Sequence, residues 1–335
     1  MQCNIAYKKC RQLNIGFCLL KLIACFLVIF QHFSVHVTNE MKNICTCAVP
    51  VFMFLSFFFT YEIFSKLNYE KFKKRLFRLM IPFYFWGVIS SLICLIFHSI
   101  FNVNFENIII ELFCGGDTKV NGVLWYLFDV IVISSLFYVI FKTFSKKAYM
   151  YLILILLFSL LMQYSSINYK LFINFPEGMS YSVGRIIEMF PYAALGILFA
   201  HYDLFNKIKQ LNISNCIITI FGITVLIAML LLRLSSPLKN ITFDYAGISY
   251  VAFTVVIIYY FYFLKIKQNS LRNLIIHISN YNLGIYCIHM LVGKFIIDVV
   301  PKNTDELFLC GLIYIVALLI SYILGKNKYL KRAVM

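Results

Sequence analysis

Long apolar runs alternate with short polar segments along the whole chain. An α-helix needs about 20 residues to cross the hydrocarbon core of a bilayer, and ten runs approach that length. Their approximate bounds are 15–35, 44–65, 80–100, 123–142, 149–163, 185–201, 213–233, 245–264, 273–295 and 306–324. The pattern predicts an all-α, polytopic integral membrane protein with about ten transmembrane helices. We expect one domain over 1–335, with its core at 15–325 and no appended soluble domain.

The composition excludes a soluble globular protein. Hydrophobic residues make up 62% of the 335 residues, and charged residues make up only 13%. Soluble globular domains carry about 25% charged residues. The chain is therefore expected to reside in a lipid bilayer.

The distribution of basic residues predicts the orientation of the helices. The formal net charge of +16 could indicate a nucleic-acid partner or an excess of Lys and Arg in short cytoplasmic loops. If the N-terminus is cytoplasmic, 21 Lys and Arg residues fall on the cytoplasmic side and eight on the outer side. This asymmetry predicts that both termini are cytoplasmic, and it argues against binding of nucleic acid.

The first apolar run contains two ionisable residues, Lys21 and His32. Ionisable side chains within a membrane span are costly and often functional. Eleven residues correspond to about three helical turns, so both side chains should share one face of the helix, about 16 Å apart along its axis. The alternative is that Lys21 snorkels and His32 lies among the headgroups. Because Lys21 is deep in the run, we favour the functional interpretation.

Arg75 and Arg78 lie where the third run enters the bilayer, shortly before Pro82. Their i, i+3 spacing places both on one face of a helix. Two guanidinium groups on one face suit a phosphate ligand with several charges. The alternative is a simple positive-inside anchor, and neighbouring lysines at 71, 73 and 74 are interpreted in that way.

Further ionisable residues in the spans indicate a buried polar cavity. Asp129 follows Trp125 by one turn, and Glu188 follows Arg185 by three residues. Either carboxylate could orient the His32 imidazole or accept hydrogen bonds from a substrate, while Glu188 could instead pair with Arg185. His289 lies within the ninth run, where it either serves the site or bonds to a neighbouring helix.

The remaining histidines indicate no metal site. They lie at span ends or in loops and are interpreted as structural: His36, His98, His201 and His277. The i, i+4 spacing of His32 and His36 has no carboxylate or further ligand nearby in sequence. We therefore expect no bound metal.

Several stretches together resemble the acyltransferase 3 family of bacterial membrane-bound O-acyltransferases. This family includes acetylases of O-antigen, capsule and exopolysaccharide. The stretches are, in order, "LLKLIACFLVIFQHF", "VPVFMFLSFFFTYE", "KKRLFRLMIPFYFW", "GVLWYLF", "FPYAALGILFA" and "ISNYNLGIYCIHMLV". The resemblance covers roughly 15–325, and it includes an Arg-x10-His motif in the first helix and an Arg-x-x-Arg motif before the third. Lys21 replaces the family's arginine, and Phe57 replaces the glycine that usually follows the serine.

The resemblance implies transfer of an acyl group, usually acetyl from acetyl-CoA, to a sugar hydroxyl of a glycan or glycolipid. His32 would be the general base, since imidazole has an ordinary pKa of about 6.5. Lys21 would place a positive charge near the thioester or the phosphopantetheine arm, and Arg75 and Arg78 would bind the CoA phosphates. His289 matches a recurrent histidine of the family's late helix. The implied location is the bacterial inner membrane, with acetyl-CoA as a substrate and no permanently bound cofactor.

Two other classes of protein share some of these features. An exporter of polysaccharide or lipid-linked sugar would also have ten spans and intramembrane charges, but it would not require Arg-x-x-Arg at the cytoplasmic surface. A structural or receptor protein would not require the buried stripe of Lys21 and His32. The sequence leaves open the acceptor, the size of the acyl group and the oligomeric state.

Overall fold

The computed structural model describes residues 14–34, 39–96, 121–164, 177–211, 215–235, 248–301 and 304–335. All regular secondary structure within these ranges is helical, which confirms the predicted all-α fold. In chain order the elements are α2 (Ile15–Phe33), α3 (Asn39–Thr46), α4 (Ala48–Ser65), α5 (Tyr69–Ile96), η1 (Gly122–Leu124), α8 (Trp125–Phe144), η2 (Ser145–Lys147), α9 (Ala148–Tyr164), α10 (Glu177–Tyr202), α11 (Leu204–Gln210), α12 (Asn215–Ser235), α13 (Ile248–Phe263), α14 (Asn269–Ser279), α15 (Asn282–Val299), α16 (Glu306–Lys326) and α17 (Lys331–Val334).

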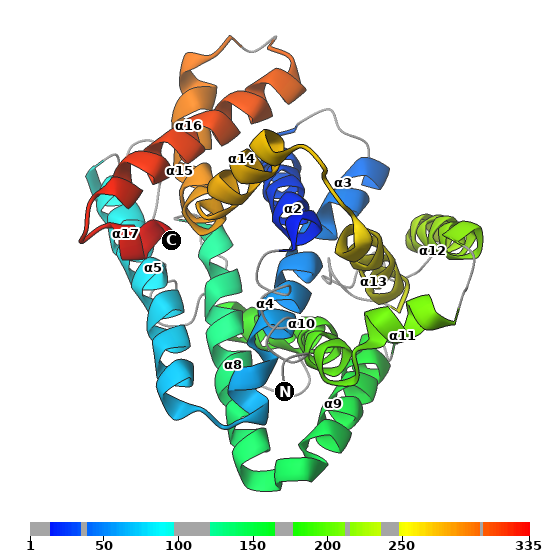
Figure 1. The fold of residues 1–335 in the computed structure, drawn as a ribbon. Coiled ribbons are helices and arrows are strands. Elements are labelled where there is room, and N and C mark those ends of the chain that lie inside the picture. The colour runs from blue at the N-terminus through cyan, green and yellow to red at the C-terminus, as the bar shows by residue number, and fades with distance from the viewer. Residues whose placement is uncertain are drawn as a thin grey trace.

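Six segments of the described chain are long and apolar enough to cross a bilayer. They are Ile15–Phe33, Ile44–Ser65, Tyr69–Ile93, Gly122–Leu161, Asn282–Val299 and Glu306–Lys326. Two shorter apolar helices cover Ile217–Ile227 and Ile248–Phe263. The segment Gly122–Leu161 reverses direction at Ser145, whose φ is 47°, and so contains both α8 and α9 (Figure 1). The structure thus supports several spans, while the number ten stays a prediction.

The central helix of the bundle is α4. It packs against α2, α5, α8, α10 and α13, and Figure 1 shows it enclosed by its neighbours. Its aromatic side chains fill the core: Phe54 contacts Phe199 and Phe57 contacts Phe137, both with ring centroids 5.4 Å apart. Since α4 contacts five surrounding helices, it ties them together into one bundle.

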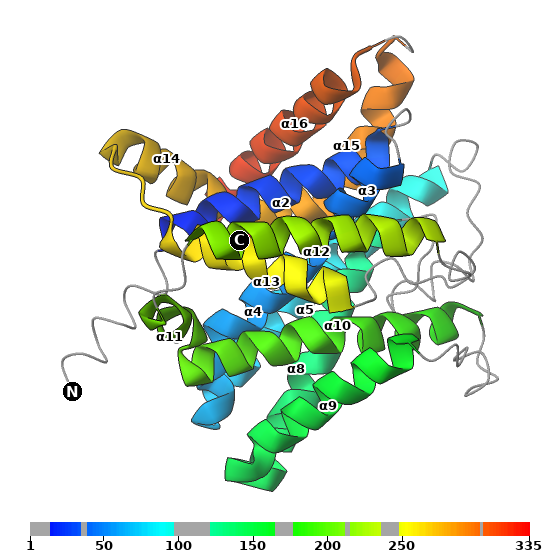
Figure 2. The same cartoon turned by 90° about the vertical axis from the view of Figure 1, so that its right-hand side faces the viewer.

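The basic connections lie towards one end of the bundle. Figure 2 shows the α8–α9 turn, α11 and α14 on its left side, whereas α3 and the end of α15 lie on its right side. This grouping is the one that a positive-inside topology requires. The side of the bilayer that each end faces stays a prediction. The predicted outer loops, 102–122, 164–184 and 234–244, lie largely outside the described residues.

The helix α5 begins earlier than the sequence analysis predicted. A span starting near residue 80 would place Pro82 in its first turn, but the helix begins at Tyr69 and contains Pro82 in its interior. The Lys71 N–H donates to Asn68 Oδ1 at 2.9 Å at the start of the helix, and Lys and Arg are good helix formers. The basic segment is therefore helical. Because Pro82 has no N–H, the Arg78 carbonyl lacks its usual partner four residues ahead.

Candidate active site

Lys21 and His32 lie on one continuous helix, α2. Asn14 Oδ1 accepts a hydrogen bond from the Phe17 N–H at 3.2 Å, and the Asn14 side-chain N–H donates to the Tyr262 carbonyl at 2.7 Å. The helix runs without interruption past both functional candidates. Lys21 and His32 therefore share one face, about 16 Å apart along the axis, as their spacing predicts.

One end of this face lies within electrostatic range of Arg78 on α5. The Nζ atom of Lys21 lies 5.4 Å from the centre of the Phe59 ring, and its charge is close enough to Arg78 for repulsion. The charges of Arg75 and Arg78 also repel each other. Gathered like charges are unfavourable alone and attract an anion. The cationic cluster of Lys21, Arg75 and Arg78 is thus suited to a ligand with several phosphates.

The two arginines of this cluster differ in their surroundings. Arg75 Nη2 donates to Ser56 Oγ at 2.9 Å, and Arg75 Nε donates to Ser134 Oγ at 3.3 Å. Its guanidinium also lies 5.3 Å from the centre of the Phe57 ring. Arg75 therefore connects α5 to α4 and α8, whereas Arg78 is exposed. The sequence suggested two equivalent phosphate ligands, but the structure gives Arg75 a structural role as well.

The other end of the α2 face lies beside α15. The rings of His32 and His289 have centroids 5.7 Å apart. His289 Nδ1 lies 2.6 Å from the Tyr286 carbonyl oxygen, which can only accept, so we assign the proton of the neutral ring to Nδ1. His289 is fully buried, and its Nε2 has no hydrogen-bond partner within the described chain. That nitrogen is an acceptor near the exposed His32 ring.

A glycine allows α2 and α15 to approach at this point. A Cβ atom on Gly293 would lie 2.1 Å from Cζ of the Phe33 ring, which is far closer than atoms can approach. Phe33 is buried and also contacts His289, with ring centroids 6.4 Å apart. The close packing at Gly293 therefore helps to set the separation of His32 and His289.

A second cluster of polar side chains lies between α8 and α10. The Arg185 guanidinium is 4.7 Å from the centre of the Trp125 ring, and its charge attracts the Asp129 carboxylate. Both oxygens of Asp129 are buried and have no hydrogen-bond partner in the described chain. Glu188 is also buried, one turn after Arg185 on α10. The structure thus brings Trp125, Asp129 and Arg185 together. The predicted His289 lies on a different helix, α15, beside His32.

A row of tyrosines links the two ends of the α2 face. The Tyr126 side chain lies near the Ser56 hydroxyl, which accepts from Arg75. The Tyr126 and Tyr286 rings have centroids 5.5 Å apart, and the Tyr286 and His289 rings have centroids 5.8 Å apart. Polar and aromatic side chains therefore run from the cationic cluster to the histidine pair.

Sequence reasoning did not identify Ser56, Tyr126 or Tyr286 as members of the site. All three occur in the stretches that carry the family resemblance, "LSFFF", "LWYLF" and "GIYCIH". A serine or tyrosine in an apolar span gives little signal, because it is uncharged and lowers hydropathy only slightly. Their pairing across helices became visible only in the structure.

Comparison with known families identifies the chain. The family model Acyl_transf_3, described as an acyltransferase domain, matches residues 14–326, which is nearly the whole chain. The protein belongs to the acyltransferase 3 family. No match was found among the curated proteins or among the solved structures. Family membership identifies acyl transfer as the general activity, and together with the apolar helices it indicates a multi-pass membrane protein.

The structure accounts for one departure of this acyltransferase 3 chain from the family pattern. Phe57 occupies the position of the usual glycine, yet α4 still approaches α10 closely. The approach is provided by Gly196 of α10, where a Cβ atom would lie 2.4 Å from the Phe54 carbonyl oxygen. Phe57 itself is fully buried and lies beneath Arg75. The close contact between α4 and α10 at this level therefore depends on Gly196.

Proposed function

We propose that this acyltransferase 3 protein transfers an acetyl or another small acyl group from acetyl-CoA to a hydroxyl of a glycan or glycolipid. The observation that carries the proposal is the face of α2, which joins a cationic cluster at Lys21 to a histidine pair at His32. The cluster suits the donor's phosphates, and the histidine pair suits deprotonation of a hydroxyl.

The donor extends along this face. Arg75 and Arg78 bind the CoA phosphates at the cytoplasmic mouth, and Lys21 holds a positive charge beside the phosphopantetheine arm. The distance of about 16 Å between the levels of Lys21 and His32 supports a donor that extends from phosphates at one end to a thioester near the other. This arrangement requires the end that bears Arg75 and Arg78 to face the cytoplasm.

The reaction needs one proton acceptor. An unprotonated His32 nitrogen removes the proton from the acceptor hydroxyl as its oxygen attacks the thioester carbonyl. The tetrahedral intermediate then expels the CoA thiolate, which takes the proton back from the His32 imidazolium. The products are the O-acyl ester and CoA with a free thiol. His289 Nε2 accepts a hydrogen bond from the other His32 nitrogen and so orients the ring.

The glycan or glycolipid that accepts the acyl group binds near the cluster of polar side chains on α8 and α10. The Asp129 carboxylate oxygens accept hydrogen bonds from sugar hydroxyls, and Trp125 offers an aromatic face. Glu188 supports this region from α10. We place the protein in the bacterial inner membrane, where cytoplasmic acetyl-CoA can reach one end of the site and a lipid-linked or exported glycan can reach the other.

The direct test is release of free CoA thiol from acetyl-CoA by the purified protein in nanodiscs, with and without surface glycan from the source cells. We expect acetyl-CoA to bind and acceptor-dependent thiol release to accompany O-acetylation of the glycan. Transport of a lipid-linked sugar without binding or consumption of acetyl-CoA would instead establish the exporter function.

A further inference from the structure

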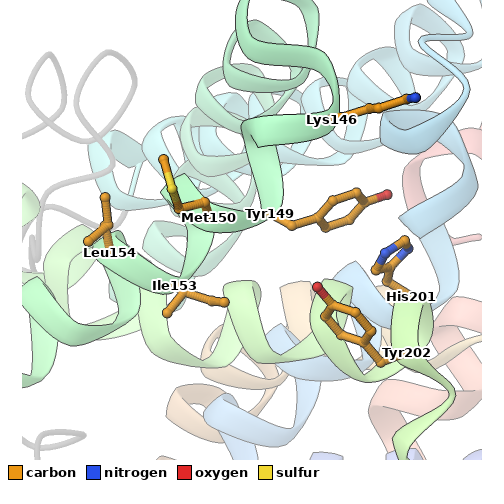
Figure 3. A pocket seen from close by; sticks show the side chains of 7 residues that line it. All are labelled: Lys146, Tyr149, Met150, Ile153, Leu154, His201 and Tyr202. Atoms are coloured by element: carbon orange, nitrogen blue, oxygen red, sulfur yellow. The ribbon is translucent and has the colours of Figure 1, made fainter.

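A groove of about 520 Å³ lies between the start of α9 and the end of α10, on helices that do not carry His32 or the cationic cluster. Its polar end is formed by Lys146, Tyr149, His201 and Tyr202, which Figure 3 shows on one side of the groove. Its position at the end of a span predicts a structural role for His201. Its contacts show that it belongs to a small cluster of polar aromatic side chains.

Ring stacking and hydrogen bonds hold the side chains of this polar end together. The Tyr149 and His201 rings stack with centroids 3.7 Å apart and planes inclined by 14°. The Tyr61 hydroxyl lies 2.9 Å from His201 Nδ1, and the Tyr149 hydroxyl donates to Tyr61 at 3.5 Å. Because Tyr61 comes from the central helix α4, the wall of the groove is fixed to the core and is formed before any ligand binds.

The polar end is also positively charged. Lys146 lines the groove, and Lys207 lies close enough to His201 for electrostatic interaction, with its Nζ 5.9 Å from the centre of the Tyr202 ring. Of the neighbouring acids, Glu62 lies 3.9 Å from Lys66, which balances its charge. The Asp203 carboxylate accepts from the neutral Asn206 amide at 3.0 Å and keeps its negative charge, so the two lysines exceed it by one positive charge. The charge at this end therefore favours an anionic group.

The rest of the groove is apolar and continues along α9. Met150, Ile153 and Leu154 line it, and each side chain is 40–50% exposed. The same face of α9 carries further exposed residues at helical spacing, Leu157, Phe158 and Leu161. A water-soluble anion such as a nucleotide has no need of this long apolar face, whereas a lipid requires it.

We propose that this groove binds an anionic phospholipid, separately from the acyl-transfer site. The headgroup phosphate lies beside Lys146 and the Tyr202 hydroxyl, and an acyl chain runs along Met150, Ile153 and Leu154 onto the exposed face of α9. Basic pockets between transmembrane helices are suited to such headgroups. The preformed polar end distinguishes this groove from an ordinary lipid-facing helix surface.

The test compares lipid retention by native mass spectrometry of the purified protein with phosphatidylglycerol and with phosphatidylcholine. We expect phosphatidylglycerol to be retained in preference, and Lys146→Ala to weaken its binding about fivefold, since one lysine contributes about that factor near an anionic lipid. Lys328→Ala, which removes an exposed lysine elsewhere, should leave retention unchanged. Equal retention of the two lipids, or no effect of Lys146→Ala, would overturn the proposal.

A second variant tests the apolar part without changing charge. Leu154→Trp fills the groove and should reduce retention of both lipids, while acetyl-CoA binding reports that the protein is folded. Displacement of phosphatidylglycerol by acetyl-CoA would show that the groove is a nucleotide site. A wild-type dimer that Leu154→Trp converts to a monomer would show that a second copy occupies it. Either result would also overturn the proposal.

Discussion

Exchange of His32 for alanine removes the proton acceptor of the proposed reaction. His32 is exposed near the end of α2, so the exchange should leave the fold intact. Since a positioned general base contributes typically 10²–10⁴-fold, acyl transfer should fall by about that factor. Acetyl-CoA binding, measured by calorimetry on the purified protein, should persist. His277→Ala removes another exposed histidine and serves as the control. If both variants transferred the acyl group at equal rates, Lys21 and His32 would have only a structural role in α2.

The requirement at Lys21 is for a positive charge at this depth of α2. Lys21→Arg restores the commoner family residue and should retain activity, whereas Lys21→Ala should lose it. Acceptor-dependent release of CoA thiol measures both variants under the same conditions. Loss of activity in Lys21→Arg would show that the geometry of the amine, and not its charge, is needed.

The two arginines of α5 should respond differently to substitution. Each charge-assisted contact to a phosphate contributes about 1.5–3 kcal/mol, so both Arg75→Ala and Arg78→Ala should weaken acetyl-CoA binding. Arg75→Ala should also lower the melting temperature, because it leaves Ser56 and Ser134 without their shared donor. Arg78→Ala should change the melting temperature less. If the double variant bound CoA like the wild type, the pair would be only a topology anchor.

At the level of elements, the packing of α2 against α15 sets the geometry of the histidine pair. Gly293→Ala should displace the buried Phe33 ring, lower the melting temperature and reduce acyl transfer. Gly311→Ala in α16 is the matched control, since no atom lies within 4 Å of the added Cβ. There the exchange should stabilise by about 1 kcal/mol. Equal effects of the two substitutions would mean that the contact at Gly293 determines neither the stability of the protein nor the rate of acyl transfer.

The sequence predicts some elements better than others. The long apolar run and the eleven-residue spacing were enough to predict α2 and its shared face. The start of α5 was missed because the charged residues at 70–78 resemble a loop in hydropathy, although Lys, Arg and Glu favour helix. The link through Ser56, Tyr126 and Tyr286 depends on contacts between distant helices, and no periodicity within one helix can reveal such contacts.

At the level of the whole molecule, the prediction concerns topology. Single cysteines introduced into a background without reactive native thiols should label from the cytoplasm at 66–79 and from outside at 102–122. The reason is the concentration of Lys and Arg at one end of the bundle. A membrane-impermeant maleimide applied to intact cells and to inverted vesicles distinguishes the two sides. Labelling of 66–79 from outside would contradict both the topology and the placement of the CoA phosphates.

Phe57 has a consequence for the position of Arg75 on the neighbouring helix. The ring is fully buried, stacks beneath Arg75 and contacts Phe64 and Phe137. Phe57→Gly would therefore open a void and remove a surface on which Arg75 rests, at a cost of about 3–5 kcal/mol or more. Because Gly196 on the facing helix already provides the close approach of α4 to α10, the smaller residue would gain no helix contact in return.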